Sequence, residues 1–212
     1  MQFLIIDDHP VIRKGLIYVI TCEPEYDTFQ FDEVGTAADA LNLLCANQYD
    51  MVLMDISLPD RSGLDVLTHM RRERPLLPVL VISTHAESLY AVRALKLGAA
   101  GYITKTSAVH VLITAIKSIL RTGKYISSNV SLMLAHEIDS SRIAHAKPHE
   151  LLSNREMEVA RMIASGTSTR EIAGQLSLSV KTINTHRSRL LAKLSLKNSV
   201  NLTTYCIQNQ LI

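Results

Sequence analysis

The run Met51–Met54 is unbroken, apolar and too short for a helix, and it ends abruptly at a carboxylate, Asp55. Such a run without alternation is typical of a strand buried on both faces, as in the middle of a parallel sheet. Asp55 then lies where the strand leaves the sheet, at the edge where open α/β sheets bind ligands. Taken alone, an Asp in this position is more often an ordinary turn or capping residue, so its role depends on the rest of the chain.

Short apolar runs and helical patterns alternate five times over residues 1–121. The other expected strands are Phe3–Ile6, Phe29–Val34, Val79–Ile82 and Gly101–Ile103. After a first helix that begins near Pro10, the expected helices are Ala37–Ala46, Gly63–Arg72, Glu87–Leu97 and Ala108–Leu120. Ser62 is the expected cap of the third helix. This alternation predicts an α/β domain built on a doubly wound, five-stranded parallel sheet.

Polar or charged residues follow four of the five expected strands, namely Asp7 with Asp8, Asp55, Ser83 and Lys105. These strand ends meet at one edge of a parallel sheet, so the side chains converge. Three carboxylates about 4 Å apart repel one another by several kcal/mol even at an effective dielectric near 20, so they need protons or a cation. Carboxylate oxygens suit Mg²⁺. A lysine and a hydroxyl opposite the metal form a cradle for a phosphoryl group, which Asp55 can accept as an aspartyl phosphate.

Residues 1–121 resemble a two-component receiver domain, which has a flavodoxin-like fold. The matching signs are the acid pair Asp7-Asp8, the Asp55…Pro59…Gly63 loop, Ser83, and Lys105 after Gly101-Tyr102. The intervals of 28 residues from Asp55 to Ser83 and 50 residues to Lys105 also resemble those of the family. Thr106 stands where many receivers have proline, although subfamilies with a DNA-binding tail often lack it.

The resemblance implies a role for each residue at this edge. The implied Mg²⁺ ligands are Asp8, Asp55 and the backbone carbonyl of Ser57, with Asp7 acting through water. Ser83 and Lys105 would hold the phosphoryl oxygens once Asp55 is phosphorylated. Tyr102 would be the aromatic residue that changes orientation on activation.

Residues 150–212 show helical patterns without strand signals. Ser153 followed by Glu156 is the signature of a capping box at the start of a first helix. Thr169 can cap a short second helix. The helices that follow are Val180–Leu194, capped by Ser179, and a fourth from Ser199 to about Gln208. A short helix followed by a tight turn and then by a longer helix with a polar outer face predicts helix-turn-helix geometry.

The long helix of this pair would be roughly 22 Å in length, enough to lie in a DNA major groove. Asn184 can read adenine with two hydrogen bonds, whereas Arg187, Arg189 and Lys193 are expected to meet the phosphate backbone. The candidate DNA-binding residues are Lys181, Thr182, Asn184, Thr185, Arg187, Ser188, Arg189 and Lys193. Spacing alone leaves open a small helical bundle with a solvated polar face.

The stretch from Leu152 to Leu196 resembles the LuxR-type helix-turn-helix, because LSNRE, GTS, EIA, LSLS, KTI and KL match its pattern. Ser199 replaces a basic residue that is common in the family, which removes one expected phosphate contact. His186 is expected on the buried face rather than as a metal ligand. The resemblance also implies that the fourth helix pairs with its twin, and the candidate dimerisation residues are Val200, Leu202, Thr203 and Ile207.

Charge supports a division into two domains. Residues 1–121 carry 11 Lys/Arg against 14 Asp/Glu, whereas residues 151–212 carry 8 against 3, so the two parts are expected to have different partners. The polar segment between them reads as a linker with a short helix near Val130–His136. We therefore expect a receiver domain over 1–121, a linker over 122–149 and a LuxR-type helix-turn-helix domain over 150–212.

The composition indicates a protein of the cytoplasm. No apolar run approaches the roughly 18 residues of a membrane span, and the N-terminus has no basic region before its apolar run, so neither a membrane partner nor a secretory signal is expected. Cys22, Cys45 and Cys206 are odd in number and far apart, as expected of reduced thiols.

The two domains together resemble response regulators of the NarL/FixJ class. This predicts a phosphorylation-controlled transcription regulator, not an enzyme, that takes a phosphoryl group from a sensor histidine kinase. Its expected form on double-stranded DNA is a homodimer on an inverted repeat, with RNA polymerase as a candidate further partner. One alternative is a phosphatase or phosphotransferase with an aspartyl-phosphate intermediate, but it needs a second acid where Ser57 stands. A constitutive DNA-binding protein is the other, and the intact acid set argues against it.

Overall fold

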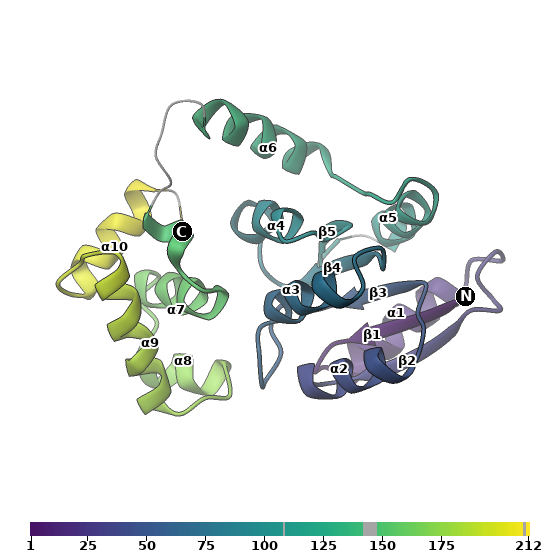
Figure 1. Cartoon of the computed structure of the whole chain (residues 1–212), viewed down its shortest axis with the longest axis horizontal. Helices are drawn as coiled ribbons and strands as arrows, with labels where there is room; N and C mark the ends of the chain where they lie inside the picture. The colour runs from purple at the N-terminus through teal and green to yellow at the C-terminus, as the bar shows by residue number, and fades with distance from the viewer. Residues whose placement is uncertain (108, 142–147, 210) are drawn as a thin grey trace. The chain divides into compact units, whose positions relative to one another are not determined.

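The computed structural model describes residues 1–107, 109–141, 148–209 and 211–212. The chain divides into two compact units, Met1–Ala135 and His136–Ile212. Strands and helices alternate in the first unit, whereas the second is helical, as Figure 1 shows. Each unit has its own buried core.

The described residues of the first unit form a five-stranded parallel sheet in the order β2-β1-β3-β4-β5. The strands are β1 (Gln2–Ile6), β2 (Gln30–Val34), β3 (Met51–Met54), β4 (Val79–Ser83) and β5 (Gly101–Thr104). All residues of the central strand β3 are buried, as expected of a strand covered on both faces. The predicted doubly wound α/β fold is confirmed. The strand order reverses between β1 and β3, which is where such folds bind ligands.

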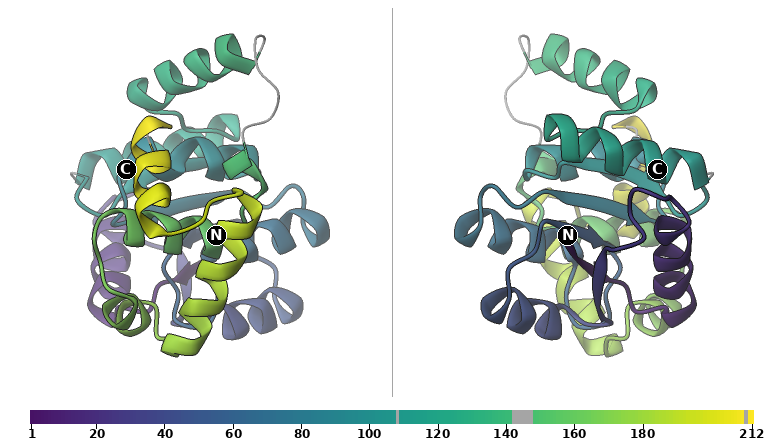
Figure 2. Two further views of the ribbon diagram at one scale, coloured as in Figure 1. Left: turned by 90° about the vertical axis from the view of Figure 1, so that its left-hand side faces the viewer. Right: turned by 90° about the vertical axis from the view of Figure 1, so that its right-hand side faces the viewer.

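Helices cover both faces of this sheet. On one face lie α2 (Ala37–Ala46), α3 (Gly63–Glu73) and α4 (Glu87–Lys96), and on the other lie α1 (Pro10–Thr21) and α5 (Val109–Thr122). The right-hand view of Figure 2 shows α1 and α2 on opposite sides of the strands. Ser62 caps α3 as predicted, since its hydroxyl accepts a hydrogen bond from Leu64 N–H. Ala108, the expected start of α5, lies outside the described residues.

The helix expected within residues 122–149 is present as α6 (Ser128–Ser141). The start of this segment folds onto the first unit: Tyr125 N–H donates to the Ala100 carbonyl, Ser127 Oγ donates to the Glu87 carboxylate, and Val130 is buried in the core. Residues 122–135 therefore belong to the first compact unit rather than to a free tether. Residues 142–147 of the expected linker lie outside the described residues, and the domain limits drawn from the sequence stay a prediction.

The second unit packs its helices around one core. They are η1 (Pro148–Leu151), α7 (Asn154–Ala164), α8 (Thr169–Gln175), α9 (Val180–Lys193) and α10 (Ser199–Gln208). Ser153 and Glu156 form the predicted capping box of α7. The expected cap of α8 at Thr169 is wrong by one residue. Ser168 caps this helix, because Glu171 lies three residues later and closes a second capping box.

None of the helices in the described ranges is both long and apolar enough to cross a membrane.

We expect Gly63→Ala to destabilise the first unit by about 1–3 kcal/mol or more, because an added Cβ would lie 2.0 Å from the Asp55 carbonyl oxygen. Gly15→Ala is the matched control. Gly15 lies in α1, and among the described residues no atom outside its own helix backbone lies within 4 Å of the added Cβ, so alanine should stabilise the helix by about 0.5–1 kcal/mol. Urea unfolding followed by far-UV circular dichroism measures both effects. Equal stability of the Gly63→Ala variant and the natural protein would contradict the close approach.

Candidate functional site

Side chains from four strand ends meet at the carboxyl edge of the sheet. Asp7 follows β1, Asp55 follows β3, Ser83 ends β4 and Lys105 follows β5. Strand pairing continues into this edge through backbone hydrogen bonds, from Asp55 N–H to Ile6 O (2.8 Å) and from Lys105 N–H to Ser83 O (2.7 Å). Asp7 and Asp55 are each only 2% exposed. The sheet itself therefore brings these charges together and keeps them from solvent.

The Lys105 ammonium lies between two buried carboxylates. Its Nζ is 2.7 Å from Asp55 Oδ2 and 2.5 Å from Asp7 Oδ2. Burial lowers the pKa of Lys105, but the hydrogen bonds to both carboxylates outweigh burial and raise this pKa above its usual value. Burial also raises the pKa of the Asp55 carboxyl; the bond from Lys105 opposes this, and the charge of Asp7 adds to it. The edge thus holds more negative charge than Lys105 alone neutralises.

The acidic groups at this edge are close enough to share a cation. Ligand atoms of Asp7, Asp8, His9 and Asp55 all lie within 4.8 Å of one another. Carboxylate oxygens are the donors that Mg²⁺ prefers, so the donor set and the excess negative charge both fit this ion. His9 was not among the residues predicted for this site. Its Nδ1 lies 2.7 Å from Asp8 Oδ1, so it stands beside the acid pair that it follows in sequence.

His85 connects several of the predicted site residues. Its Nε2 lies 3.1 Å from Ser57 Oγ, its N–H donates to Ser83 Oγ at 3.3 Å, and its carbonyl accepts the Tyr102 hydroxyl at 2.8 Å. Ser57 N–H in turn donates to Asp55 Oδ1 at 3.2 Å. Sequence reasoning missed His85. The available signal was its position two residues after a strand that ends at the site.

Tyr102 is buried in this structure. Its side chain is 2% exposed and packs in the core beneath α2, α3 and α4. Burial raises the pKa of its phenol well above the usual value. The backbone carbonyl of His85 accepts the Tyr102 hydroxyl, and the His85 ring stacks on the Tyr90 ring with centroids 4.6 Å apart. Tyr102 is therefore held inward, and its change of orientation on activation stays a prediction.

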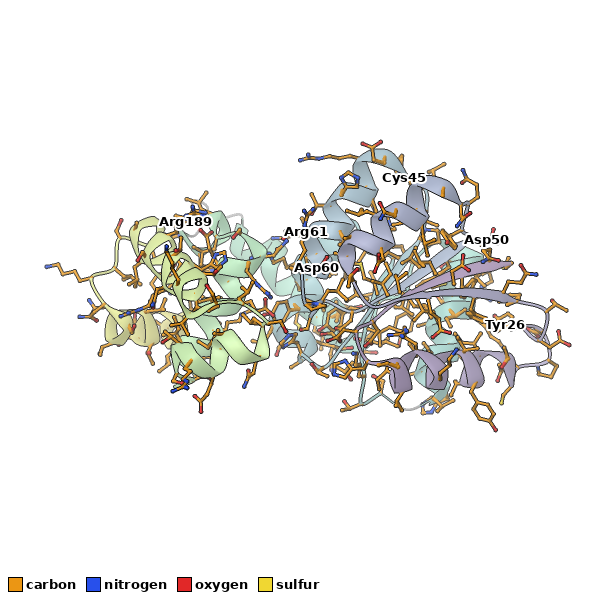
Figure 3. The ribbon with its side chains drawn as sticks, turned by 90° about the horizontal axis from the view of Figure 1, so that it is seen from below. Tyr26, Cys45, Asp50, Asp60, Arg61 and Arg189 are labelled. Atoms are coloured by element: carbon orange, nitrogen blue, oxygen red, sulfur yellow. The ribbon has the colours of Figure 1, made fainter. Side chains whose placement is uncertain are left out.

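The loop after β3 is fixed by backbone contacts. The Asp60 carboxylate accepts the N–H groups of Ala37 and Ala38, both at 2.9 Å, at the N-terminus of α2. Burial raises the pKa of Asp60, but these hydrogen bonds outweigh burial and lower it. Gly63 N–H donates to the Ile56 carbonyl at 2.7 Å. The loop is thereby anchored to two helices, which holds Asp55 at the sheet edge; Figure 3 labels Asp60 and Arg61 in it.

A buried ion pair supports the helix-turn-helix of the second unit. Arg155 of α7 lies 2.7 Å from the Glu158 carboxylate and donates to the Leu176 carbonyl at 2.9 Å, at the end of α8. The turn that follows places Ser177 at a φ of 50°. Arg155, the arginine of the LSNRE motif, thus ties α7 to the end of α8, next to the turn from which α9 departs.

The outer face of α9 carries most of the predicted DNA-binding residues. Those that are exposed are Lys181, Asn184, Thr185, Ser188, Arg189 and Lys193. On the inner face Ile183 and Leu190 are fully buried. Thr182 is half-buried, and its Oγ1 lies 2.8 Å from the Ser179 hydroxyl within the helix cap. His186 is also half-buried, as expected of a packing residue, and burial lowers the pKa of its imidazole.

Two of the predicted phosphate-binding residues already have partners within the second unit. Arg187 is half-buried, and its Nε donates to Ser199 Oγ at 3.0 Å. The Lys193 ammonium lies 2.6 Å from the Glu156 carboxylate of the α7 capping box. Both side chains therefore stabilise the packing of α9, and Arg189 is the basic residue near the middle of this helix that remains exposed.

The exposed face of α10 differs from the predicted one. Val200 is 74% exposed and Ile207 is 61% exposed, so both are available to a partner. Thr203 is half-buried, with its hydroxyl donating to the Ser199 carbonyl. The inclusion of Leu202 in the dimerisation surface is wrong, because this side chain is fully buried in the core of its own unit.

Comparison with known proteins gives the same two parts. Residues 3–117 match the response regulator receiver domain, and residues 150–206 match the bacterial regulatory proteins of the luxR family. The response regulator UvrY of Escherichia coli is 31% identical over 100% of this chain and 95% of its own, and GacA of Pseudomonas aeruginosa is 31% identical over 100% and 98%. RcsB of Salmonella enterica serovar Typhimurium, solved bound to the rprA promoter with a phosphomimetic, is 25% identical over 97% of both chains, with a TM-score of 0.56.

The receiver match spans more than half of the chain, and the relatives match along nearly their whole length. The site geometry and the exposed α9 face lie within these two matched regions. The chain therefore belongs to the two-component response regulators of the NarL/FixJ class, and it is a phosphorylation-dependent, DNA-binding regulator of transcription.

Proposed function

We propose that Asp55 is the phosphoacceptor of this regulator and that a sensor histidine kinase is the donor. The observation that carries the proposal is the position of Lys105, whose ammonium bridges the buried carboxylates of Asp7 and Asp55. In the reaction an oxygen of Asp55 forms a bond to phosphorus while the phosphorus–nitrogen bond of the donor histidine breaks. The Lys105 ammonium then exchanges its bond to Asp55 for one to a phosphoryl oxygen, where it offsets the new negative charge.

The acidic residues are proposed to hold the cation that this reaction needs. Asp8, Asp55 and the Ser57 carbonyl would bind Mg²⁺, with Asp7 acting through water. Mg²⁺ supplies charge neutralisation between the incoming phosphoryl group and the carboxylates. Asp55 is almost fully buried, and burial followed by the charge of Asp7 raises its pKa against the opposing bond from Lys105. A further cation beside Asp55 would stabilise its ionised form, which is the form that attacks phosphorus.

Phosphorylation is proposed to be sensed through Ser83. Its hydroxyl now accepts the His85 N–H, and the His85 carbonyl accepts the Tyr102 hydroxyl. A phosphoryl group on Asp55 would draw the Ser83 hydroxyl toward itself, which changes the position of His85 and then of Tyr102. A switch of this kind needs only a few kcal/mol of differential stability between two packings.

We expect acetyl phosphate to add one phosphoryl group to the chain only when Mg²⁺ is present, because the carboxylates otherwise repel the incoming anion. Intact mass spectrometry measures the product. Asp55→Asn should abolish the addition. Asp50→Asn should leave it unchanged, since Asp50 precedes the same strand and lies away from the site. Lys105→Ala should keep some phosphorylation but lose its coupling to DNA binding. Label that persists in Asp55→Asn would contradict the assignment.

The α9 helix is proposed to read DNA in the major groove. Asn184, Thr185 and Ser188 are exposed and can reach base edges, while Lys181 and Arg189 can meet phosphates. Thr182, Arg187 and Lys193 are proposed as secondary contacts, because each already has a partner inside the second unit. RcsB, which shares this fold, was solved in complex with promoter DNA.

We expect Arg189→Ala to weaken binding similarly on all DNA sequences and to make the salt dependence shallower by about one unit. Asn184→Ala should instead cost about 1–3 kcal/mol on the preferred site and little on random duplex. Fluorescence anisotropy on both duplexes at several salt concentrations separates the two effects. Lys117→Ala removes an equal charge from the first unit and should change neither the DNA affinity nor its salt dependence. If Asn184→Ala weakens both duplexes equally, α9 does not read bases.

We further propose that the phosphorylated protein binds an inverted repeat as a homodimer. One helix-turn-helix reads too few base pairs to find its sites in a genome, and two copies about 34 Å apart multiply the specificity. Val200 and Ile207 on α10 are apolar, exposed and on one face of the helix, so they can pair with a second copy. Thr203 lies between them and is a proposed neighbour of the contact.

We expect beryllofluoride to convert the protein to a dimer and Ile207→Asp to prevent this on a full inverted repeat, because a carboxylate would replace the apolar contact. Analytical ultracentrifugation with and without DNA measures the state. Leu76→Glu is the control, since it alters an exposed leucine of the first unit. Binding to a single half-site should be unchanged in both variants. If the treated protein stays monomeric on the full repeat, the dimer mechanism is wrong. Release of the second unit from the receiver would then explain activation better.

The proposed location is the cytoplasm, where both the phosphorylated kinase and the chromosome are accessible. RNA polymerase is a candidate partner at the promoter. We also keep the domain limits 1–121, 122–149 and 150–212 as a proposal. The matched family regions, 3–117 and 150–206, support the first and the third of these domains. The enzyme alternative is not favoured, because Ile56 and Ser57 follow Asp55 where a second catalytic acid would be needed.

A further inference from the structure

A pocket of about 570 Å³ opens at the amino edge of the receiver sheet. Its lining residues include Asp50, Pro78 and Ala100, which immediately precede β3, β4 and β5. Figure 3 shows Asp50 and Asp60, which lie before and after β3, toward opposite ends of the sheet. The pocket is therefore separate from the phosphorylation site, and its volume lies within the usual range for small-molecule sites.

Two cations line this pocket, and neither has a carboxylate partner within the described part of the chain. Arg71 Nη1 donates to the Pro75 carbonyl at 2.5 Å, and Lys124 Nζ donates to the Ala99 carbonyl at 2.7 Å. The Arg71 Nε is buried and has no hydrogen-bond partner among the residues that the structure describes. Among the described residues, no carboxylate oxygen lies within ion-pair distance of Arg71 or Lys124. Carbonyl oxygens satisfy a donor but do not cancel its charge.

The two charges act on each other. Burial lowers the pKa of the Arg71 guanidinium, and burial followed by the charge of Arg71 lowers the pKa of Lys124. Asp50 also lines the pocket, and its carboxylate keeps its negative charge while it accepts the N–H of Gln2 at 2.8 Å. Within the described residues it forms no ion pair with either cation, so the two cations face a single carboxylate and leave an excess of positive charge. An anion that contacts both would relieve this repulsion.

Gly98 allows Arg71 to take this position. An added Cβ at Gly98 would lie 2.8 Å from both Cδ and Nε of Arg71, and the residue has a φ of 99°. The arginine side chain thus lies directly against the backbone that ends α4. This close approach holds the guanidinium beside the segment whose next carbonyl, Ala99, binds Lys124. Close packing thus positions Arg71, and the hydrogen bond to Ala99 holds the exposed Lys124 beside it.

We propose that this pocket binds a small organic phosphate monoester, with its phosphate between Arg71 and Lys124. A phosphate monoester carries nearly two negative charges, and its oxygens can accept charge-assisted hydrogen bonds from both a guanidinium and an ammonium. The rest of the lining is largely apolar, with Pro75, Leu76 and Leu120 beside the cations. Leu76 is 93% exposed, so an apolar part of the ligand would cover it. A free inorganic phosphate would leave these contacts unused.

Phenyl phosphate is a suitable probe, because it combines a phosphate with an apolar ring. We expect it to shift the amide resonances of Gly98, Ala99 and Gly123 in nitrogen-15 correlation spectra of the full chain, recorded without Mg²⁺. The amides of Ser57 and His85 at the phosphorylation site should move little. Shifts at the phosphorylation site alone would overturn the proposal. Phenol, which lacks the anion, should bind at least about tenfold more weakly.

Lys124→Gln and Arg71→Gln should each weaken phenyl phosphate binding by about tenfold or more, because each removes a charge-assisted hydrogen bond. Arg72→Gln is the matched control, since Arg72 is the exposed neighbour on the same helix and does not line the pocket. Thermal melting checks that each variant folds, and Lys124→Gln carries the test alone if Arg71→Gln does not fold. Equal affinity in Lys124→Gln, Arg72→Gln and the natural protein would overturn the proposal. The Asp55 phosphorylation assay is independent of this result.

Discussion

The Lys105 ammonium between the carboxylates of Asp7 and Asp55 is the interaction on which the receiver's site depends. Each of these three side chains follows a different strand, so their meeting requires the strands to be parallel and in register. Two buried carboxylates without the ammonium would repel each other strongly in a region of low dielectric. The ion pairs therefore stabilise the resting site, and the same ammonium is available to a phosphoryl group when one arrives.

Much of this site could be predicted because it follows from the order of elements. Apolar runs that end at Asp55, Ser83 and Lys105 place these groups at one edge once the sheet is parallel. His85 could not be found in this way, since its role comes from a loop conformation that turns its ring toward Ser57 and its carbonyl toward Tyr102. Loop geometry depends on tertiary contacts that periodicity does not describe.

The second unit shows a different limit of sequence reasoning. Helical spacing predicts which residues of α9 point outward, and Asn184 and Arg189 do. It does not show which outward residues already have a partner within the unit. Lys193 forms an ion pair with Glu156, which belongs to the capping box of α7. Leu202 was misplaced for a related reason. Val200 and Leu202 are two residues apart, which places them on different faces of a helix, and only the exposed one is available to a partner.

The two edges of the receiver sheet carry excess charge of opposite sign. At the carboxyl edge the carboxylates exceed the ammonium of Lys105, so a cation is needed before an anion can approach. At the amino edge neither Arg71 nor Lys124 has an ion-pair partner among the residues that the structure describes, so the proposed anion needs no cation before it binds. Both groups of charges are held by backbone contacts at strand or helix ends. Since a parallel sheet gathers its strand ends into two separate edges, one domain can keep two sites of opposite charge without either neutralising the other.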